Sequence, residues 1–363
     1  MKILYAIQGT GNGHLARATE IIPHLQKFGE VDILVSGIQG DINLPFEVKY
    51  KFYGLSFMFG KKGGVDYWQT VFKSRPFGLL RDILQVPVET YDLVLNDFEP
   101  VSAWACRLKG IRCVSVSHQS AVLHPLAPRP PKDNFIARII LKYYAPAKVN
   151  YGFHFRALDF YHFTPVIRSS IRNASPRNKD HYTVYLPAYS DAMIEKLLSR
   201  FAEVKWEVFS KKCRHEYQID NIRFSPVSLD GFHDSFVNCS GLLCNAGFEA
   251  PSEAIFLGKK LCVIPMKNQY EQACNAAMLS DMGISVANKA NELPSVLKRW
   301  IKESYSIRIK FPDQTHDILR RIMMEKRETK TSKTVIPEKI LIRAINCIAA
   351  SSPVSSHLRQ RPL

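Results

Sequence analysis

The sequence has 363 residues, of which 46% are hydrophobic and 23% charged, so it is long enough for two globular domains and too apolar for a disordered chain. Its formal net charge is +16 at pH 7, which calls for anionic partners or a solvated basic surface. Because no pattern typical of an RNA- or DNA-binding module accompanies this charge, we expect no nucleic-acid partner. Phosphorylated substrates and anionic lipids remain as candidates.

Targeting features and cysteines both favour a cytoplasmic protein. The first apolar stretch, residues 3–7, is too short for a signal peptide. No apolar run reaches the roughly 18 residues of a membrane span. The eight cysteines form no C-x-x-C pair and most lie in apolar stretches, as reduced and buried thiols do.

The first half of the chain predicts alternating strands and helices. The apolar run at 3–7 predicts a strand that ends in the loop Gly9-Thr10-Gly11-Asn12-Gly13-His14. Apolar residues then recur at spacings of three and four, which predicts a helix that buries Leu15, Ala18, Ile22 and Leu25. Further strands are expected at 31–35, 93–95 and 113–116. This alternation predicts an α/β domain with a parallel sheet covered by helices on both faces.

The second half repeats the pattern after a linker-like stretch rich in Pro, Asn and basic residues. Strands are expected at 182–186, 206–209, 242–244 and 261–264, and helices at 190–201, 250–257 and 269–281. We therefore predict two domains, at 1–175 and 176–335. An apolar helix at 336–350 is expected to pack back on the first domain, and 351–363 to form a frayed tail.

The glycine loop after the first strand suggests a backbone that closely approaches an anionic ligand. The dinucleotide fingerprint G-x-G-x-x-G would need its last glycine where His14 stands, which excludes a dehydrogenase of that type. A Walker loop is excluded because no G-K-[ST] follows. A tight turn without a ligand is the alternative.

Several titratable side chains are expected at the carboxyl edge of the first sheet. His14 ends the glycine loop, and its ordinary pKa near 6.5 suits a base that accepts a proton from a hydroxyl group; a helix N-cap is the alternative. Asp97 and Glu99 follow one predicted strand, and His118 with Gln119 follows another. We expect Asp97 to orient His14 and stabilise its imidazolium. His14, Asp97 and His118 are the predicted catalytic residues.

The stretch from 241 to 283 carries the second group of candidate residues. A strand ends in a small-residue turn at Gly247, and a helix begins near Pro251, which favours phosphate binding at the helix start. Glu253, one turn later, could bind two ribose hydroxyls or could simply pair with the helix dipole. Glu271 and Gln272 open the next helix and suit sugar hydroxyls, with a solvated helix start as the alternative.

These motifs resemble the donor-binding region of GT-B glycosyltransferases, and most closely the family 28 type, which includes the enzyme that adds N-acetylglucosamine to lipid-linked muramyl pentapeptide. The resemblance rests on 245–248, 252–254, 257–260 and 269–276, together with the loop at 9–14. It implies two facing Rossmann-like domains, an acceptor in the first, a nucleotide-sugar donor in the second, and neither a cofactor nor a required metal. On that pattern Glu253 holds the ribose, and the donor is also contacted by Tyr189, Ser190, Asn245, Gly247, Phe248, Glu271 and Gln272. Two departures are Asn12-Gly13, where the family has adjacent glycines, and Asn245 at the start of the turn.

The predicted reaction is metal-independent transfer of a hexosyl group from a nucleotide-diphosphate sugar, of the UDP class, with inversion and with His14 as base. A nucleotide-sugar 2-epimerase of the same fold and a non-catalytic nucleotide-sugar-binding subunit are the alternatives. The stretch 135–144 mixes apolar and basic residues, as an interfacial helix does, which favours a lipid-linked acceptor and contact with an anionic membrane at the inner face. A buried core helix is the other interpretation.

Overall fold

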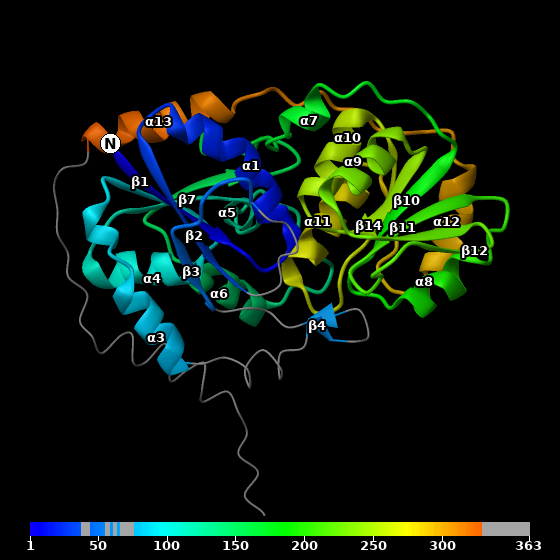
Figure 1. Ribbon diagram of the computed structural model, residues 1–363, viewed down its shortest axis with the longest axis horizontal. Helices are drawn as coiled ribbons and strands as arrows, with labels where there is room; N and C mark the ends of the chain where they lie inside the picture. Colours follow the sequence, from blue (N-terminus) through cyan, green and yellow to red (C-terminus); the bar gives the residue numbers. More distant parts are fainter. Residues whose placement is uncertain (38–43, 55–58, 61–63, 66–75, 329–363) are drawn as a thin grey trace, which may run out of the picture.

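The computed structural model describes residues 1–37, 44–54, 59–60, 64–65 and 76–328. They contain two seven-stranded sheets that lie side by side, the first ending at residue 163 and the second starting at residue 181 (Figure 1). Helices cover these sheets, so the expected α/β class with two parallel-sheet halves is confirmed.

The first sheet is parallel throughout, in the order β3-β2-β1-β6-β7-β8-β9. Its strands are β1 (Lys2–Gln8), β2 (Glu30–Ser36), β3 (Tyr50–Phe52), β6 (Leu93–Asp97), β7 (Cys113–Ser117), β8 (Val149–Phe153) and β9 (His162–Phe163). Side chains of β1 alternate between two cores, with Ile3, Tyr5 and Ile7 in one and Leu4 and Ala6 in the other. The central strand is therefore buried on both faces, which explains why it reads as a continuous apolar run.

Helices of the first half follow its strands. They are α1 (Asn12–Gln26), α3 (Pro76–Gln85), α4 (Pro100–Lys109), α5 (His118–Val122) and α6 (Phe135–Tyr144), with a 3-10 turn, η1 (Val88–Thr90). The predicted apolar face of α1 is confirmed, since Leu15, Ala18, Ile22 and Leu25 are all buried. Glu99, expected among the titratable groups of the sheet edge, instead caps α4 by accepting the backbone N–H groups of Val101 and Ser102.

The second sheet has the order β12-β13-β11-β10-β14-β15-β16, and its edge strand β12 is antiparallel. Its strands are β10 (His181–Tyr185), β11 (Lys205–Ser210), β12 (Tyr217–Ile219), β13 (Ile222–Pro226), β14 (Gly241–Asn245), β15 (Lys260–Ile264) and β16 (Ser285–Val286). Its helices are α8 (Asp191–Leu198), α9 (Leu229–Asn238), α10 (Glu249–Leu257), α11 (Tyr270–Asp281) and α12 (Leu293–Lys302). Leu242 and Cys244 of β14 belong to the same buried cluster as Ile7 of β1, so one apolar core is continuous between the halves.

The chain returns to the first half at its carboxyl-terminal end. Helix α13 (Thr315–Glu328) lies along α1 and buries Ile318, Leu319 and Ile322 (Figure 1). The helix predicted at 336–350 and the tail at 351–363 lie outside the described residues. The remaining elements are a two-stranded ribbon, β4 (Phe59–Gly60) with β5 (Gly64–Val65), and α7 (Ser169–Arg172) between the halves.

The cysteines and the helices bear on the expectations about thiols and membrane spans. The seven cysteines within the described residues are buried and free, as expected; Cys347 lies outside them. Among the helices of the described segments, none has the length and hydrophobicity needed to cross a bilayer.

Candidate active site

A cavity of about 880 Å³ lies between the carboxyl-end loops of the two sheets. The loop after β1 and the start of α1 form one wall, and the loops after β10, β11, β13, β14 and β15 form the other. Ligand crevices of α/β proteins lie at this edge, where strands end and helices begin. His14 and Glu253 both line the cavity, so the candidate residues of the two halves share one site.

Three glycines allow the loop after β1 to pass close to its neighbours. A Cβ atom on Gly9 would lie 2.8 Å from a β2 side chain, and one on Gly13 would lie 2.6 Å from Glu249 Oε2 in the second half. Gly11 has φ of +95°, a conformation that side chains other than glycine rarely adopt. The glycines therefore bring the loop against α10, across the cavity.

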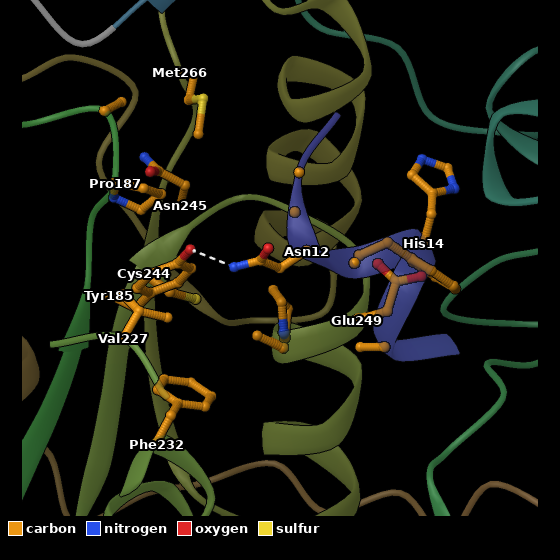
Figure 2. A pocket seen from close by; sticks show the side chains of 18 of the residues that line it. Asn12, His14, Tyr185, Pro187, Val227, Phe232, Cys244, Asn245, Glu249 and Met266 are labelled. Atoms are coloured by element: carbon orange, nitrogen blue, oxygen red, sulfur yellow. Dashed lines mark hydrogen bonds between the residues drawn. The ribbon is translucent and has the colours of Figure 1, made fainter. Parts of the chain in front are cut away.

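Asn12 joins the same loop to the second sheet. Its Nδ2 donates a hydrogen bond to the hydroxyl of Tyr185, the last residue of β10, at 3.2 Å. Figure 2 shows Asn12 reaching toward Tyr185, with Asn245 and Met266 on that side of the cavity. The position that departs from the family 28 pattern thus forms a contact between the halves.

His14 is held by a buried carboxylate at the end of β6. Its Nδ1 lies 2.8 Å from Asp97 Oδ1, and Arg17 donates to both carboxylate oxygens, at 2.6 and 3.1 Å. Burial alone would raise the pKa of Asp97, but the charges of Arg17 and His14 outweigh it and lower that pKa, so Asp97 is ionised. Burial lowers the pKa of His14, whereas Asp97 raises it, and the net direction is upward. The carboxylate therefore stabilises the imidazolium.

The other ring nitrogen of His14 lies beside a row of hydrogen-bonded side chains that crosses between the halves. Gln119 Nε2 lies 3.3 Å from His14 Nε2 and donates to Glu271 Oε2 at 2.9 Å. Burial raises the pKa of Glu271. Glu271 belongs to α11, so these two hydrogen bonds set the position of the imidazole relative to that helix. His14 and Glu271 both line the cavity.

Two carboxylates of α10 are paired with arginines from other segments. Arg168 donates to both oxygens of Glu253, at 2.6 and 2.7 Å, and Arg17 is bonded to Glu249. Glu253 is buried, and Arg168 lines the cavity beside it. Neither arginine was expected from the sequence: Arg168 lies within the predicted linker, and Arg17 lies within the amphipathic pattern of α1.

With this geometry in view, comparison with known proteins identifies the family. Residues 1–303 match the family described as Glycosyl transferase family 1. The chain belongs to this family. No curated protein sequence is similar enough to count as a match.

Solved structures of two glycosyltransferases and of one epimerase are similar to this chain. SnogD from Streptomyces nogalater is 14% identical, with a TM-score of 0.50 over 89% of this chain and 99% of its own. The glycotransferase of kitacinnamycin is 13% identical, with a TM-score of 0.50 over 97% and 99%. A UDP-N-acetylglucosamine 2-epimerase is 12% identical, with a TM-score of 0.49 over 93% and 99%. The family 1 chain thus has the GT-B architecture of two facing Rossmann-like halves. The finer resemblance to the family 28 type stays a prediction.

Most candidate donor and loop residues of this family 1 protein line the cavity. They are Thr10, Gly11, Asn12, Gly13, His14, Asn245, Gly247, Phe248, Glu253, Glu271 and Gln272. Further lining residues without a predicted role include Arg168, Lys211, Lys212, Phe232, Glu249 and Met266. Apart from Phe232 and Arg168, these residues lie in or just after the loop that follows a predicted strand. Considering the loop after every predicted strand would therefore have found Lys211, Lys212, Glu249 and Met266.

The structure differs from the expectation at the loop after β10. Tyr185, Pro187 and Ala188 line the cavity, whereas Tyr189 and Ser190 lie outside its lining. The reason is that Ser190 caps α8 and accepts the backbone N–H of Met193, which turns this end of the loop toward the helix. The donor contacts predicted for Tyr189 and Ser190 stay a prediction.

His118 is buried between the halves and is not exposed at the sheet edge. Its Nδ1 lies 2.7 Å from the Phe153 carbonyl oxygen and its Nε2 lies 2.7 Å from Asn275 Oδ1 in α11. The ring stacks on Phe248 with centroids 3.9 Å apart. Burial lowers its pKa to about 4. The catalytic role predicted for His118 is untested, and the geometry supports a contact between the halves instead.

Proposed function

We propose that this family 1 protein transfers a hexosyl group from a nucleotide-diphosphate sugar, of the UDP class, to an acceptor hydroxyl with inversion. The observation that carries the proposal is the shared cavity, where a carboxylate-paired histidine from one half faces the start of α10 from the other. Glycosyl transfer needs these two elements together, a base for the acceptor and a binding site for the leaving diphosphate.

The donor is assigned to the second half. Gly247 precedes α10, and among the described residues a Cβ there would meet no atom within 4 Å other than those of its chain neighbours, so a diphosphate has room beside the amides of the helix start. Lys211 and Lys212 add positive charge to the lining, whereas the charge of Arg168 is balanced by Glu253. Glu253 is the proposed ribose ligand, and Glu271 with Gln272 contacts the donor sugar.

The proposed step is a single displacement. His14 donates its Nδ1–H to Asp97 and accepts the acceptor's hydroxyl proton on Nε2. The freed oxygen attacks the anomeric carbon while the bond from that carbon to the nucleotide diphosphate breaks. The leaving charge is stabilised by the backbone amides and dipole at the start of α10 and by the cationic side chains of the lining.

A thermal-shift screen of nucleoside diphosphates and their sugars tests the donor, because a bound ligand raises the melting temperature. The best binder is then incubated alone and with candidate acceptors. An epimerase would convert the donor sugar without an acceptor, and a binding subunit would never release nucleotide. Stabilisation by no nucleotide at all would contradict the proposal.

We further propose a lipid-linked acceptor and contact with the anionic inner face of a membrane. Helix α6 exposes 69% of Phe135 and 68% of Ile136, and Ile139, Ile140 and Tyr143 are also exposed; among its residues only Tyr144 is buried. The alternative of a buried core helix is therefore wrong. Arg138 and Lys142 lie on the same short helix, and basic residues beside an apolar face favour an anionic interface.

A further inference from the structure

A cluster of two histidines and an aspartate lies apart from the residues that line the cavity. His124 follows α5, His162 begins β9, and Asp159 precedes that strand. Asp159 accepts from both rings, at 3.1 Å from His124 Nε2 and 2.7 Å from His162 Nδ1. The two rings lie with centroids 4.7 Å apart.

The arrangement has the donors of a metal site. One ligand atom from each residue lies within 4.8 Å of the other two. Around a tetrahedral zinc ion with bonds of about 2.1 Å, neighbouring donors are about 3.4 Å apart, so modest side-chain movement suffices. His162 is buried, His124 is half-buried and Asp159 is exposed, which leaves the carboxylate side open for the ion and for a water ligand.

We propose that His124, Asp159 and His162 bind a divalent transition-metal ion of the zinc class. Two imidazoles with one carboxylate suit such ions, whereas Mg²⁺ and Ca²⁺ prefer all-oxygen sites. The ion replaces the two N–H groups that now face Asp159. Each neutral ring keeps one proton, which moves to its other nitrogen. His124 Nδ1 then no longer accepts the Leu126 backbone N–H, now at 3.2 Å, and that exposed amide turns to water.

The ion would have a structural role. It would tie the turn after α5 to β9, and α5 carries both His118, which contacts α11, and Gln119, which contacts His14. Gly152 supports this packing, because a Cβ there would lie 2.5 Å from His162 and 2.9 Å from the Ala121 backbone nitrogen. The proposal is independent of the nature of the transfer reaction.

The test uses the full chain, stripped with EDTA and titrated with Co²⁺ and Zn²⁺. Co²⁺ should give visible absorption bands that saturate at one ion per chain, and Zn²⁺ should displace it and raise the melting temperature. In Asp159→Asn and His162→Gln, affinity should fall by about tenfold or more. His215→Gln is the matched control, because His215 is an exposed histidine in another part of the chain.

Three results would overturn the site. They are no absorption in the wild type, absorption retained in both cluster variants, or equal loss in His215→Gln. Asp159→Asn changes an exposed side chain, so it reports on the site even if His162→Gln does not fold. Circular dichroism on each metal-free variant separates loss of ligand from loss of structure.

Discussion

The two ring nitrogens of His14 have different partners, and this difference determines its proposed role. Nδ1 faces the ionised Asp97, so the neutral ring carries its proton there and leaves Nε2 as an acceptor. Replacing His14 with alanine should lower turnover by about a hundredfold or more if it is the base. Single-turnover transfer with saturating donor measures this. Donor affinity should remain, since the proposed donor ligands lie in the second half, and His215→Ala is the surface control.

The pH profile tests the same residue through its carboxylate. The base must be neutral to work, so activity should rise with pH through the pKa of His14, which Asp97 raises above the ordinary 6.5. Plots of kcat/KM against pH should therefore fall on the acid side with a midpoint above 6.5. Asp97→Asn removes the charge that stabilises the imidazolium, and its midpoint should move to lower pH. An unmoved midpoint would assign the acid limb to another group.

The sequence predicted the main residues of the candidate site but few of their partners. Asp97 was expected beside His14 because both follow strands of one parallel sheet, and the ends of such strands share an edge. Arg168 could not be paired with Glu253, because 85 positions separate them and only the approach of the two halves brings them together. His118 lies buried between the halves, because a residue just past a strand can turn inward as easily as outward, and its catalytic role stays a prediction.

The start of α10 is the element on which the donor site depends. If Glu253 binds ribose hydroxyls, Glu253→Gln should weaken binding of the preferred nucleoside diphosphate by about tenfold or more, since hydrogen bonds to charged groups contribute about 1.5–3 kcal/mol. Isothermal titration measures the change. Glu195→Gln on α8, outside the cavity lining, should bind normally. Equal affinity in the two variants would leave Glu253 as the structural partner of Arg168 alone.

Helix α6 is the element that tests the membrane proposal. Ile136→Glu should reduce sedimentation with phosphatidylglycerol vesicles by about tenfold, because burying one such side chain contributes about 1.5–3 kcal/mol. Met193→Glu, an exposed residue on α8 of the other half, is the control and should behave like the wild type. Binding should weaken with salt and be poor on phosphatidylcholine. Binding that both variants lose equally would point to charge alone.

Long periodic segments were the predictable elements, and short ones were not. The predicted helix at 269–281 matches α11, and the predicted strand at 206–209 lies within β11. Strands β9 and β16 have two residues each, too few for any periodicity to appear. These two strands form because β9 pairs with β8 and β16 pairs with β15, and such pairing depends on the tertiary structure.

At the scale of the whole molecule, the two halves are joined by polar contacts at the cavity and by apolar packing elsewhere. The polar contacts include Arg17 with Glu249 and Arg168 with Glu253. The apolar core runs from the first sheet to the second without a break. A molecule joined in this way should unfold largely as one unit, although the sequence alone predicted two domains with a linker between them.

Helix α13 provides the test of that unity, because it follows the second half in the chain and packs on the first. Leu319→Ala removes a buried side chain from the shared core and should lower the free energy of unfolding by about 2–5 kcal/mol. Met324→Ala, on the exposed face of the same helix, should change it by no more than about 0.5 kcal/mol. Urea unfolding followed by tryptophan fluorescence suits the measurement in a Trp68→Phe, Trp104→Phe background, because the two remaining tryptophans, Trp206 and Trp300, lie buried in the second half. If the halves unfold together, Leu319→Ala shifts this distant signal to lower urea. If they unfold separately, the signal stays in place while far-ultraviolet circular dichroism shows an earlier transition of the first half.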